Sequence, residues 1–414
     1  CSSDLIEALY GVLLPRLREQ GMEKLYFDVE LPLCRVLADM ERSGFLVDGG
    51  ALARFGADLS DTIHRLEQRI YAAAGQQFNI NSPKQLGKVL FEDLGLPHGK
   101  KTKSGWSTNA DVLEKLKDHP LVADVLTYRQ YAKLKSTYAD GLLKVIDPDG
   151  RIRTSFQMTV TATGRLSSTE PNLQNIPTRT ELGSKMREMF VAAPGHVLVD
   201  ADYSQIELRL LAHISGDTAM QQAFLSGADF HTVTAARVFH VPQDQVTHQM
   251  RSRAKAVNFG IVYGISAFSL SQDIGVTVQE AKEYMDRYFA TYTGVKQYMT
   301  DVVDKAREQG YVETLWHRRR ALPELKSSNF NMRSFGERVA LNMPIQGTAA
   351  DIIKLAMVRV HSRLAAEGLA ARLIMQVHDE LIVECPEEEV PRVEALLQQE
   401  MQGVAELSVP LLAE

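Results

Sequence analysis

Residues 251–264 of this 414-residue chain read RSRAKAVNFGIVYG. Four of its side chains recur every four residues: Arg251, Lys255, Phe259 and Tyr263. On a helix each lies about 40° beyond the one before, so together they form a slowly drifting stripe about 18 Å long. Two cations followed by two aromatic rings suit a ligand with a polyanion at one end and a flat ring at the other, such as a nucleoside triphosphate. The alternative is an ordinary amphipathic helix, with Ala254, Val257 and Ile261 facing the core.

A first candidate carboxylate site follows the apolar run at residues 197–199, VLV, which favours a strand. Ser204, followed three residues later by Glu207, has the spacing of a capping box and predicts that a helix begins there. Asp202 therefore falls between a strand and a helix. A carboxylate in that position can project from a rigid sheet into open space, as a metal ligand must.

A second candidate carboxylate lies in residues 373–385, LIMQVHDELIVEC. Two apolar runs flank a three-residue polar turn, which predicts a β-hairpin with Asp379 at its tip. Asp is also a preferred turn residue for local reasons, and this is the alternative. Mg²⁺ takes few protein ligands, often one or two carboxylates plus substrate phosphates. Asp202 and Asp379 could hold two such ions for an in-line displacement, provided that the fold brings them together.

The composition favours an ordinary globular protein. Its 45% hydrophobic and 24% charged residues are typical of that class, and the length predicts about two to four domains. No apolar run approaches the roughly 18 residues of a membrane span. Cys1, Cys34 and Cys385 have no metal-like spacing, and their odd number argues against a disulfide framework. Because the chain begins at Cys1 rather than Met, we interpret it as a segment of something longer.

The net charge of −6 is unusual for a protein that binds DNA, so the distribution of charge has to decide. Residues 98–135 hold four acids and eight basic side chains: Lys100, Lys101, Lys103, Lys115, Lys117, Arg129, Lys133 and Lys135. Residues 317–320, HRRR, form a second basic cluster, whereas residues 384–414 hold eight Glu and one Arg. The basic stretches could contact phosphates or could be plain solvated surface, and the acidic end is interpreted as a solvated face.

Several segments together resemble family A DNA polymerases, the DNA polymerase I group. Three of them resemble the family's polymerase motifs: residues 202–209, 251–264 and 376–380. Three more extend the resemblance, in the family's order: residues 163–168, 171–177 and 342–351. The resemblance covers nearly the whole chain. It implies an α/β (α+β) fold of the right-hand polymerase type, with an antiparallel-sheet palm, helical fingers and a helical thumb.

The resemblance also implies a division of the chain. We expect five parts: residues 1–42 as lead-in helices left from an exonuclease-like domain, 43–142 as the thumb, 143–206 as the first part of the palm, 207–335 as the fingers, and 336–414 as the second part of the palm, C-terminally truncated relative to the family. Turn and cap signals agree with this, since Ser82-Pro83 predicts a helix start and residues 147–150, DPDG, predict a turn that opens a strand-rich stretch.

The activity that the resemblance implies is template-directed addition of deoxynucleoside triphosphates to a primer 3′-hydroxyl, with Mg²⁺ ions as cofactors and Mn²⁺ as a possible substitute. The expected catalytic residues are Asp202, Asp379, Lys255 and Glu380. The expected metal ligands are Asp202, Asp379 and the Tyr203 carbonyl. The expected nucleotide-binding residues are Arg251, Lys255, Phe259, Tyr263, His231, Gln205 and Glu207. The expected DNA-binding residues are Arg165, Asn172, Asn175, Arg338, Asn342, Gln346 and His378.

Other interpretations remain open from the sequence. A phage-type single-subunit RNA polymerase shares the two Asp residues and the cationic–aromatic helix, and a DNA-binding scaffold without activity is a third possibility. Glu207 could be a capping residue or a wall that excludes a ribose 2′-hydroxyl, and His231 could be a plain residue of an amphipathic helix. We expect a monomer of the bacterial cytosol, bound to primer–template DNA and not to a membrane, with neither proofreading nor 5′-nuclease activity in this chain.

Overall fold

The computed structural model describes residues 2–99, 101–102, 105–177 and 180–414. The chain divides into two compact units, each made from more than one stretch of sequence. The first unit comprises Cys1–Ser43, Ser155–Thr169 and Ala193–Glu414, and the second comprises Gly44–Thr154 and Glu170–Ala192. The finer division expected from the sequence stays a prediction.

The second unit is mainly helical. Its helices are α3 (Gly49–Ala74), α4 (Pro83–Lys88), the π-helix η2 (Val89–Asp93), α5 (Ala110–Glu114), α6 (Pro120–Lys133), the π-helix η3 (Leu134–Ala139), α7 (Asp140–Leu143) and α8 (Glu181–Arg187). Its strands pair in twos, β1 (Phe45–Leu46) with β4 (Arg151–Ile152) and β2 (Lys101–Thr102) with β3 (Gly105–Trp106). Ser82 caps α4 ahead of Pro83, as predicted, and Leu86, Leu90 and Val125 lie fully buried in the core.

Several basic residues of the stretch 98–135 have partners within the protein. Lys117 pairs with Glu114 and Lys135 with Asp140, while Arg129 donates to the Thr108 carbonyl. Two of the lysines counted there, Lys100 and Lys103, lie outside the described residues. Lys115 and Lys133 are exposed, so phosphate contact from this stretch stays a prediction that rests mainly on them.

The first unit is built around a three-stranded antiparallel sheet of order β10-β11-β7. The strands are β10 (Arg372–Val377), β11 (Glu380–Pro386) and β7 (His196–Asp202). The predicted hairpin is confirmed, but its turn holds two residues, His378 and Asp379, instead of three. The difference arises because Glu380 is already a strand residue that pairs with Val377 on one side and Asp202 on the other. Mixed helices and antiparallel strands confirm the expected fold class.

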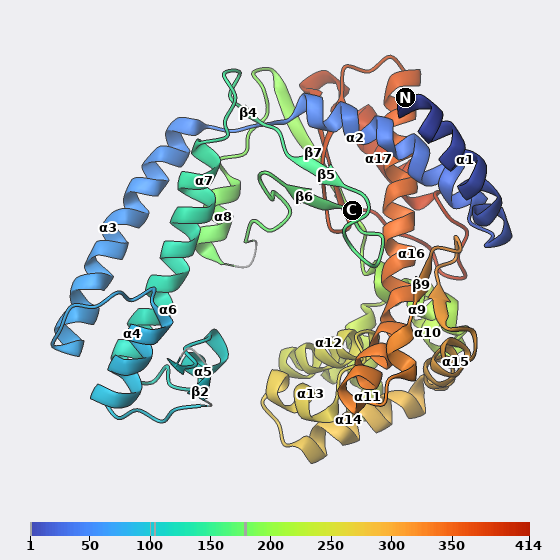
Figure 1. The fold of residues 1–414 in the computed structure, drawn as a ribbon. Coiled ribbons are helices and arrows are strands. Elements are labelled where there is room, and N and C mark those ends of the chain that lie inside the picture. Colours follow the sequence, from blue (N-terminus) through green and yellow to red (C-terminus); the bar gives the residue numbers. More distant parts are fainter. Residues whose placement is uncertain (1, 100, 103–104, 178–179) are drawn as a thin grey trace. The chain divides into compact units, whose positions relative to one another are not determined.

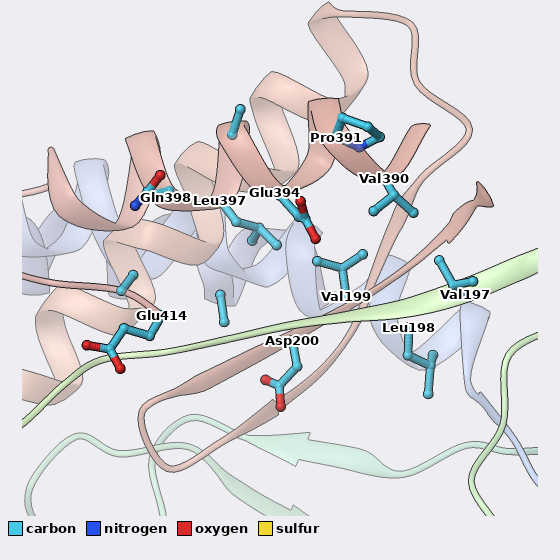
Figure 2. Close-up of a pocket in the computed structure, with 13 residues that line it drawn as sticks. Val197, Leu198, Val199, Asp200, Val390, Pro391, Glu394, Leu397, Gln398 and Glu414 are labelled. Atoms are coloured by element: carbon cyan, nitrogen blue, oxygen red, sulfur yellow. The ribbon is translucent and has the colours of Figure 1, made fainter. Parts of the chain in front are cut away.

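Helices cover this sheet. The 37-residue α16 (Phe330–Ala366) and α2 (Leu31–Ser43) pack against β10, and α17 (Val390–Gln402) packs against β7 and β11. Beside α17, an open groove of about 790 Å³ follows β7. Figure 2 shows it lined by apolar side chains and by the carboxylates of Asp200, Glu394 and Glu414. Residues 412–414 run beside the end of β7, where Asp202 and Glu414 exchange two backbone hydrogen bonds of 2.9 and 3.0 Å.

Residues 207–335 are mostly helical, as predicted, and Figure 1 shows α11 to α14 gathered together. The helices are α9 (Ile206–Ser215), α10 (Thr218–Leu225), α11 (Phe230–Phe239), the 3₁₀-helix η4 (Gln243–Gln245), α12 (His248–Val262), α13 (Ala267–Ile274), α14 (Val278–Thr291), α15 (Thr293–Gln309) and the 3₁₀-helix η5 (Pro323–Lys326). A short hairpin of β8 (Tyr311–Glu313) and β9 (Arg319–Ala321) interrupts them.

For the N-terminal stretch the predicted secondary structure is confirmed, and for the stretch after residue 150 it is confirmed only in part. The N-terminal residues are helical as expected, in α1 (Ser2–Glu19), the π-helix η1 (Leu25–Glu30) and α2. The stretch after residue 150 holds the strand pair β5 (Ser155–Gln157) and β6 (Ser167–Thr169), but α8 breaks it, which the strand-rich expectation missed. No helix of the described ranges is both long and apolar enough to cross a membrane.

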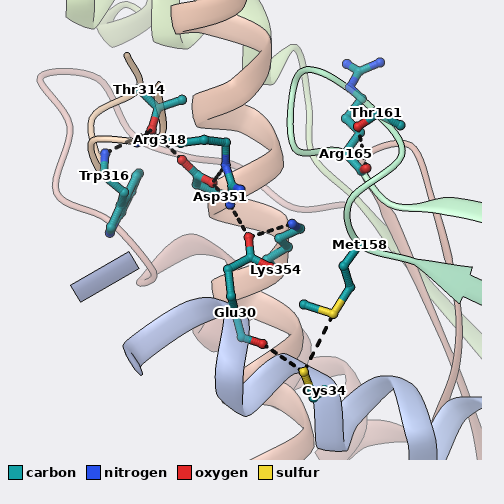
Figure 3. Close-up of polar contacts among 10 residues, drawn as sticks. All are labelled: Glu30, Cys34, Met158, Thr161, Arg165, Thr314, Trp316, Arg318, Asp351 and Lys354. Carbon is teal, nitrogen blue, oxygen red and sulfur yellow. Dashed lines mark hydrogen bonds and ion pairs between the residues drawn. The ribbon is translucent and has the colours of Figure 1, made fainter. Parts of the chain in front are cut away.

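A buried ion network in the first unit involves part of the basic cluster at residues 317–320, for which the sequence left phosphate contact and plain solvated surface open. Arg318 bonds to Asp351, which is fully buried, and to Glu30, which Lys354 also contacts at 2.8 Å (Figure 3). Arg319 bonds to Glu313. A charged side chain in the interior is costly unless an opposite charge lies beside it. The acids of this network supply that charge, so these cations can lie inside the protein.

The network predicts a stability effect at Lys354, whose side chain is 1% exposed. Lys354→Met should lower the free energy of unfolding by about 3 kcal/mol, because the buried acids lose a compensating charge. Arg307→Ala, which breaks exposed pairs with Asp304 and Glu337, is the matched control and should cost less than about 1 kcal/mol. Urea titration of both variants measures the difference, and equal losses would contradict a structural role for the network.

Candidate active site

The β7–β11 pairing brings the candidate carboxylates together. Asp202, the last residue of β7, lies opposite Glu380, the first residue of β11. Asp379 precedes Glu380 in the turn, and its carbonyl accepts a hydrogen bond of 3.2 Å from the Tyr203 backbone N–H. Backbone hydrogen bonds, and not side-chain contacts, therefore bring Asp202 and Asp379 close together. The sequence alone did not establish that they meet.

Asp379 disfavours the ionisation of Asp202. Burial and the neighbouring Asp379, Asp200 and Glu414 raise the pKa of Asp202 to about 6. Burial also raises the pKa of Asp379, against which Arg165 and His378 act. A divalent cation relieves such repulsion. No group of three or more His, Cys, Asp or Glu side chains in the described ranges could hold a metal ion. Two carboxylates are nevertheless the small donor set that suits Mg²⁺ bound together with substrate phosphates.

Helix α12 carries the predicted stripe. Thr247 caps its start by accepting from the Met250 N–H, and the face with Ala254 and Val257 is fully buried. The stripe itself is accessible: Lys255 and Tyr263 are exposed, and Arg251 and Phe259 are half-buried. The amphipathic-helix alternative therefore describes the opposite face of the same helix. It does not account for the cations and rings.

The start of α11 lies against α12 and holds two of its side chains. Asp229, the residue that caps α11, forms two hydrogen bonds of 2.8 Å with the Arg251 guanidinium. His231 is 3% exposed, and its Nδ1 lies 2.9 Å from the Asn258 amide nitrogen. Burial lowers the pKa of His231 to about 4, so the ring is neutral near pH 7. Neither Asp229 nor Asn258 was singled out from the sequence.

Glu207 contacts residues from two other elements of the site, and these contacts show that the capping-box prediction was wrong. Its carboxylate, 7% exposed, accepts from Arg165 at 2.7 Å and from the Tyr263 hydroxyl at 2.9 Å. The helix instead starts after Gln205, a left-handed residue (φ 55°) without a side-chain cap. The Ser204 N–H, which a capping box would assign to Glu207, donates to the Leu412 carbonyl. A buried carboxylate gains more from a guanidinium than from a backbone N–H, which explains the outcome.

The aromatic end of α12 meets α16 beside Glu207. Gln346 hydrogen-bonds to Tyr263, and burial together with Glu207 raises the pKa of that phenol to about 12. Gly264 has φ 64° and packs against Arg338, whose Cγ would lie 3.3 Å from an added Cβ. Arg338, Asn342 and Gln346 follow one another at four-residue spacing along α16. These contacts place three expected DNA-binding residues on a helix that touches the end of α12.

Comparisons with known proteins agree with this geometry. The sequence model for "DNA polymerase family A" matches residues 50–414. The chain belongs to DNA polymerase family A. It is 54% identical over 409 residues to DNA polymerase I of Geobacillus stearothermophilus and 53% identical over 409 residues to that of Bacillus subtilis (strain 168). Each alignment covers 98% of this chain, and the chain spans about half the length of each relative, 47% and 46%.

A solved structure of the family has the same fold. The POL domain of Pol1 from M. smegmatis, in complex with DNA primer-template and dNTP, superposes with a TM-score of 0.93 at 46% identity. The match covers 99% of this chain and 72% of that one. Because the identity is this high over nearly the whole chain, the two proteins share a family as well as a fold.

The remaining expected residues fall in several places. His378 lies in the β10–β11 turn with φ 52°, and Gln205 has a buried Oε1 without a partner in the described part of the chain. Asn172 and Asn175 belong to the second unit, where Asn172 accepts from the Gln174 N–H and the Asn175 carbonyl accepts from Tyr138. The DNA contacts of these two residues stay predictions.

The buried histidine predicts a pH dependence of stability. Between about pH 6.5 and pH 4 the unfolded chain binds a proton that the folded His231 does not, so the free energy of unfolding should fall as the pH falls through this window. The loss is up to about 3 kcal/mol at about 1.4 kcal/mol per pKa unit.

Urea titrations at several pH values check this. His231→Gln should flatten the fall, whereas His248→Gln, at an exposed position on α12, should keep the parent curve. If the His231→Gln and parent curves run parallel between pH 4 and pH 6.5, His231 is not buried in its neutral form.

Proposed function

We propose that this chain is a template-directed DNA polymerase. It adds deoxynucleoside triphosphates to a primer 3′-hydroxyl by phosphoryl transfer and releases pyrophosphate. The observation that carries the proposal is the register that sets Asp202 opposite Glu380 and brings Asp379 to the same sheet end. Membership of the family and the solved relative in complex with DNA primer-template and dNTP support it.

Asp202 and Asp379 would hold two Mg²⁺ ions, with the Tyr203 carbonyl as a further ligand and Glu380 as a supporting acid. When bound, the ions supply a lowered pKa for the 3′-hydroxyl and charge stabilisation for the phosphates. Mn²⁺ has similar oxygen ligands and is the expected substitute. The repulsion that raises the pKa of Asp202 is the property of this chain that favours cation binding.

The α12 stripe would bind the incoming nucleotide. Arg251 and Lys255 would neutralise charge on the triphosphate, and Lys255 would protonate the leaving pyrophosphate. A neutral His231 whose Nδ1 accepts from Asn258 carries its proton on Nε2, where it can donate to a phosphate oxygen. Phe259 and Tyr263 stack near the base and sugar, beside Gln205. Phosphoryl transfer needs this positioning and charge stabilisation more than covalent chemistry.

Duplex contacts would come from polar residues of both units. Those in the first unit are Arg165, Arg338, Asn342, Gln346 and His378, and those in the second unit are Asn172 and Asn175. Minor-groove acceptors are shared by all correct base pairs, so such residues can check pairing independently of sequence. We further propose that the chain acts as a monomer, in the bacterial cytosol where its DNA substrate lies.

Primer extension with and without Mg²⁺ tests the activity directly. The parent chain should extend a primer with deoxynucleotides only when Mg²⁺ is present. Asp202→Ala and Asp379→Ala should each abolish extension, because each removes one of two carboxylates, while duplex binding by gel shift stays near the parent value. Asp200→Ala, on the same strand, is the matched control and should retain activity. Binding without extension by the parent chain would favour the inactive scaffold.

The buried carboxylate of Glu207 predicts the choice of sugar. It fills the space beside Tyr263, so Glu207→Ala should raise the efficiency of ribonucleotide incorporation relative to deoxyribonucleotide by about tenfold or more. Glu280→Ala removes a true capping box, with Thr277, and should leave sugar choice unchanged. Equal sugar discrimination in the Glu207 variant and the parent would show that Glu207 does not exclude a ribose 2′-hydroxyl. Preference of the parent for ribonucleotides would favour the phage-type RNA polymerase.

We also propose that these 414 residues neither proofread nor cut 5′ ends. The described residues hold no group of three or more His, Cys, Asp or Glu side chains that could bind a metal ion. Incubation with a mismatched primer and Mg²⁺, without nucleotides, should yield no shortened strand. Steady trimming that co-purifies with the chain, and that survives Asp202→Ala, would contradict the proposal.

A further inference from the structure

The carboxylate of Asp229, which caps the start of α11, accepts hydrogen bonds from Thr232 and from Arg251. Asp229 Oδ2 accepts from the Thr232 N–H at 2.8 Å and from the Thr232 hydroxyl at 2.6 Å. The same oxygen accepts from Arg251 Nε at 2.8 Å, and Oδ1 accepts from Arg251 Nη2 at 2.8 Å. A helix cap needs only the first of these bonds. The others fix the carboxylate and tie it to α12.

We propose that Asp229 is a positioning residue for triphosphate binding. It binds one edge of the Arg251 guanidinium and so fixes the orientation of that group. This inference rests on the proposed function, in which Arg251 contacts the triphosphate. In this proposal Asp229 acts through Arg251 and does not itself bind the nucleotide.

The geometry of the pair supports this role. A guanidinium offers five N–H donors in a rigid plane, and Asp229 takes those of one edge, Nε and Nη2. Nη1 has no hydrogen-bond partner within the part of the chain that the structure describes. The plane is thereby fixed, with a free edge for a second anion. Bidentate recognition of this kind depends on the orientation of the plane and not on charge alone.

The exposure of the pair explains why positioning is needed. The Arg251 side chain is 42% exposed, so without a partner it would sample many rotamers. Asp229 is itself immobilised by Thr232, and Arg251 holds the pKa of Asp229 well below its usual range, so the carboxylate stays ionised near neutral pH. Ordering Arg251 before the nucleotide arrives removes part of the entropy that binding would otherwise lose.

Two other roles for Asp229 predict different outcomes. If Asp229 only caps α11, a residue that caps equally well should leave nucleotide affinity unchanged. If it competes with the triphosphate for Arg251, removal of its charge should increase affinity. A positioning role alone predicts a loss of affinity that depends on Arg251.

Asp229→Asn separates these roles, because Asn caps a helix as well as Asp but lacks the charge that binds both guanidinium nitrogens. In single-nucleotide extension we expect KM for the nucleotide to rise roughly threefold to tenfold, with kcat within about twofold of the parent. Asp48→Asn is the matched control: Asp48 caps α3 by accepting from the Ala51 N–H at 2.8 Å and should leave both constants unchanged.

The dependence on Arg251 is tested by a double-substitution cycle. Nucleotide affinity is measured by fluorescence titration of the complex with a dideoxy-terminated primer–template, which requires no turnover. Asp229→Asn should weaken binding in the parent and have no further effect in Arg251→Ala. Unchanged or tighter binding in Asp229→Asn, or equal weakening in both backgrounds, would overturn the inference. A parent chain that binds no nucleotide and extends no primer would instead refute the proposed function.

Discussion

The antiparallel register of β11 with β7 is the constraint on which the candidate active site depends. It sets Glu380 opposite Asp202 and continues for seven residue pairs to Pro386 opposite His196. On the other side of β7, Glu414 exchanges backbone hydrogen bonds with Asp202. The strand end that carries Asp202 is therefore held from both sides. A shift of one residue would turn each side chain to the opposite face and separate the two carboxylates.

Around this sheet end, buried charges link elements that are distant in sequence. Glu207 connects the loop that carries Arg165 to Tyr263 at the end of α12, and Gln346 connects Tyr263 to α16. The guanidinium of Arg318 lies under the same loop, where an added Cβ on Gly164 would approach its Nε to 2.5 Å. Arg165, Glu207 and Tyr263 thus form one connected set of contacts that reaches α16 through Gln346, within the first unit.

The sequence predicted those features whose causes are local. The strand before Asp202, the hairpin around Asp379 and the periodic stripe of α12 depend on neighbouring residues and on their spacing, and all three are confirmed. The capping box at Ser204 was wrong because the partners of Glu207 come from 42 and 56 residues away. The inward position of Arg318 could not be inferred from the sequence, because its partner Glu30 lies 288 residues distant. The roles of Asp229 and Asn258 depend on α11 packing against α12, which no local pattern reveals.

The central claim is that Asp202 and Asp379 form a site for two metal ions at the end of the sheet. Crystals of the chain with Mn²⁺, a dideoxy-terminated primer–template and a matching nucleotide would test it most directly, because Mn²⁺ can be located by anomalous diffraction. The account predicts two anomalous peaks about 3.5–4 Å apart, both in contact with Asp202 and Asp379. Peaks elsewhere, or none at this sheet end while the nucleotide is bound, would contradict it.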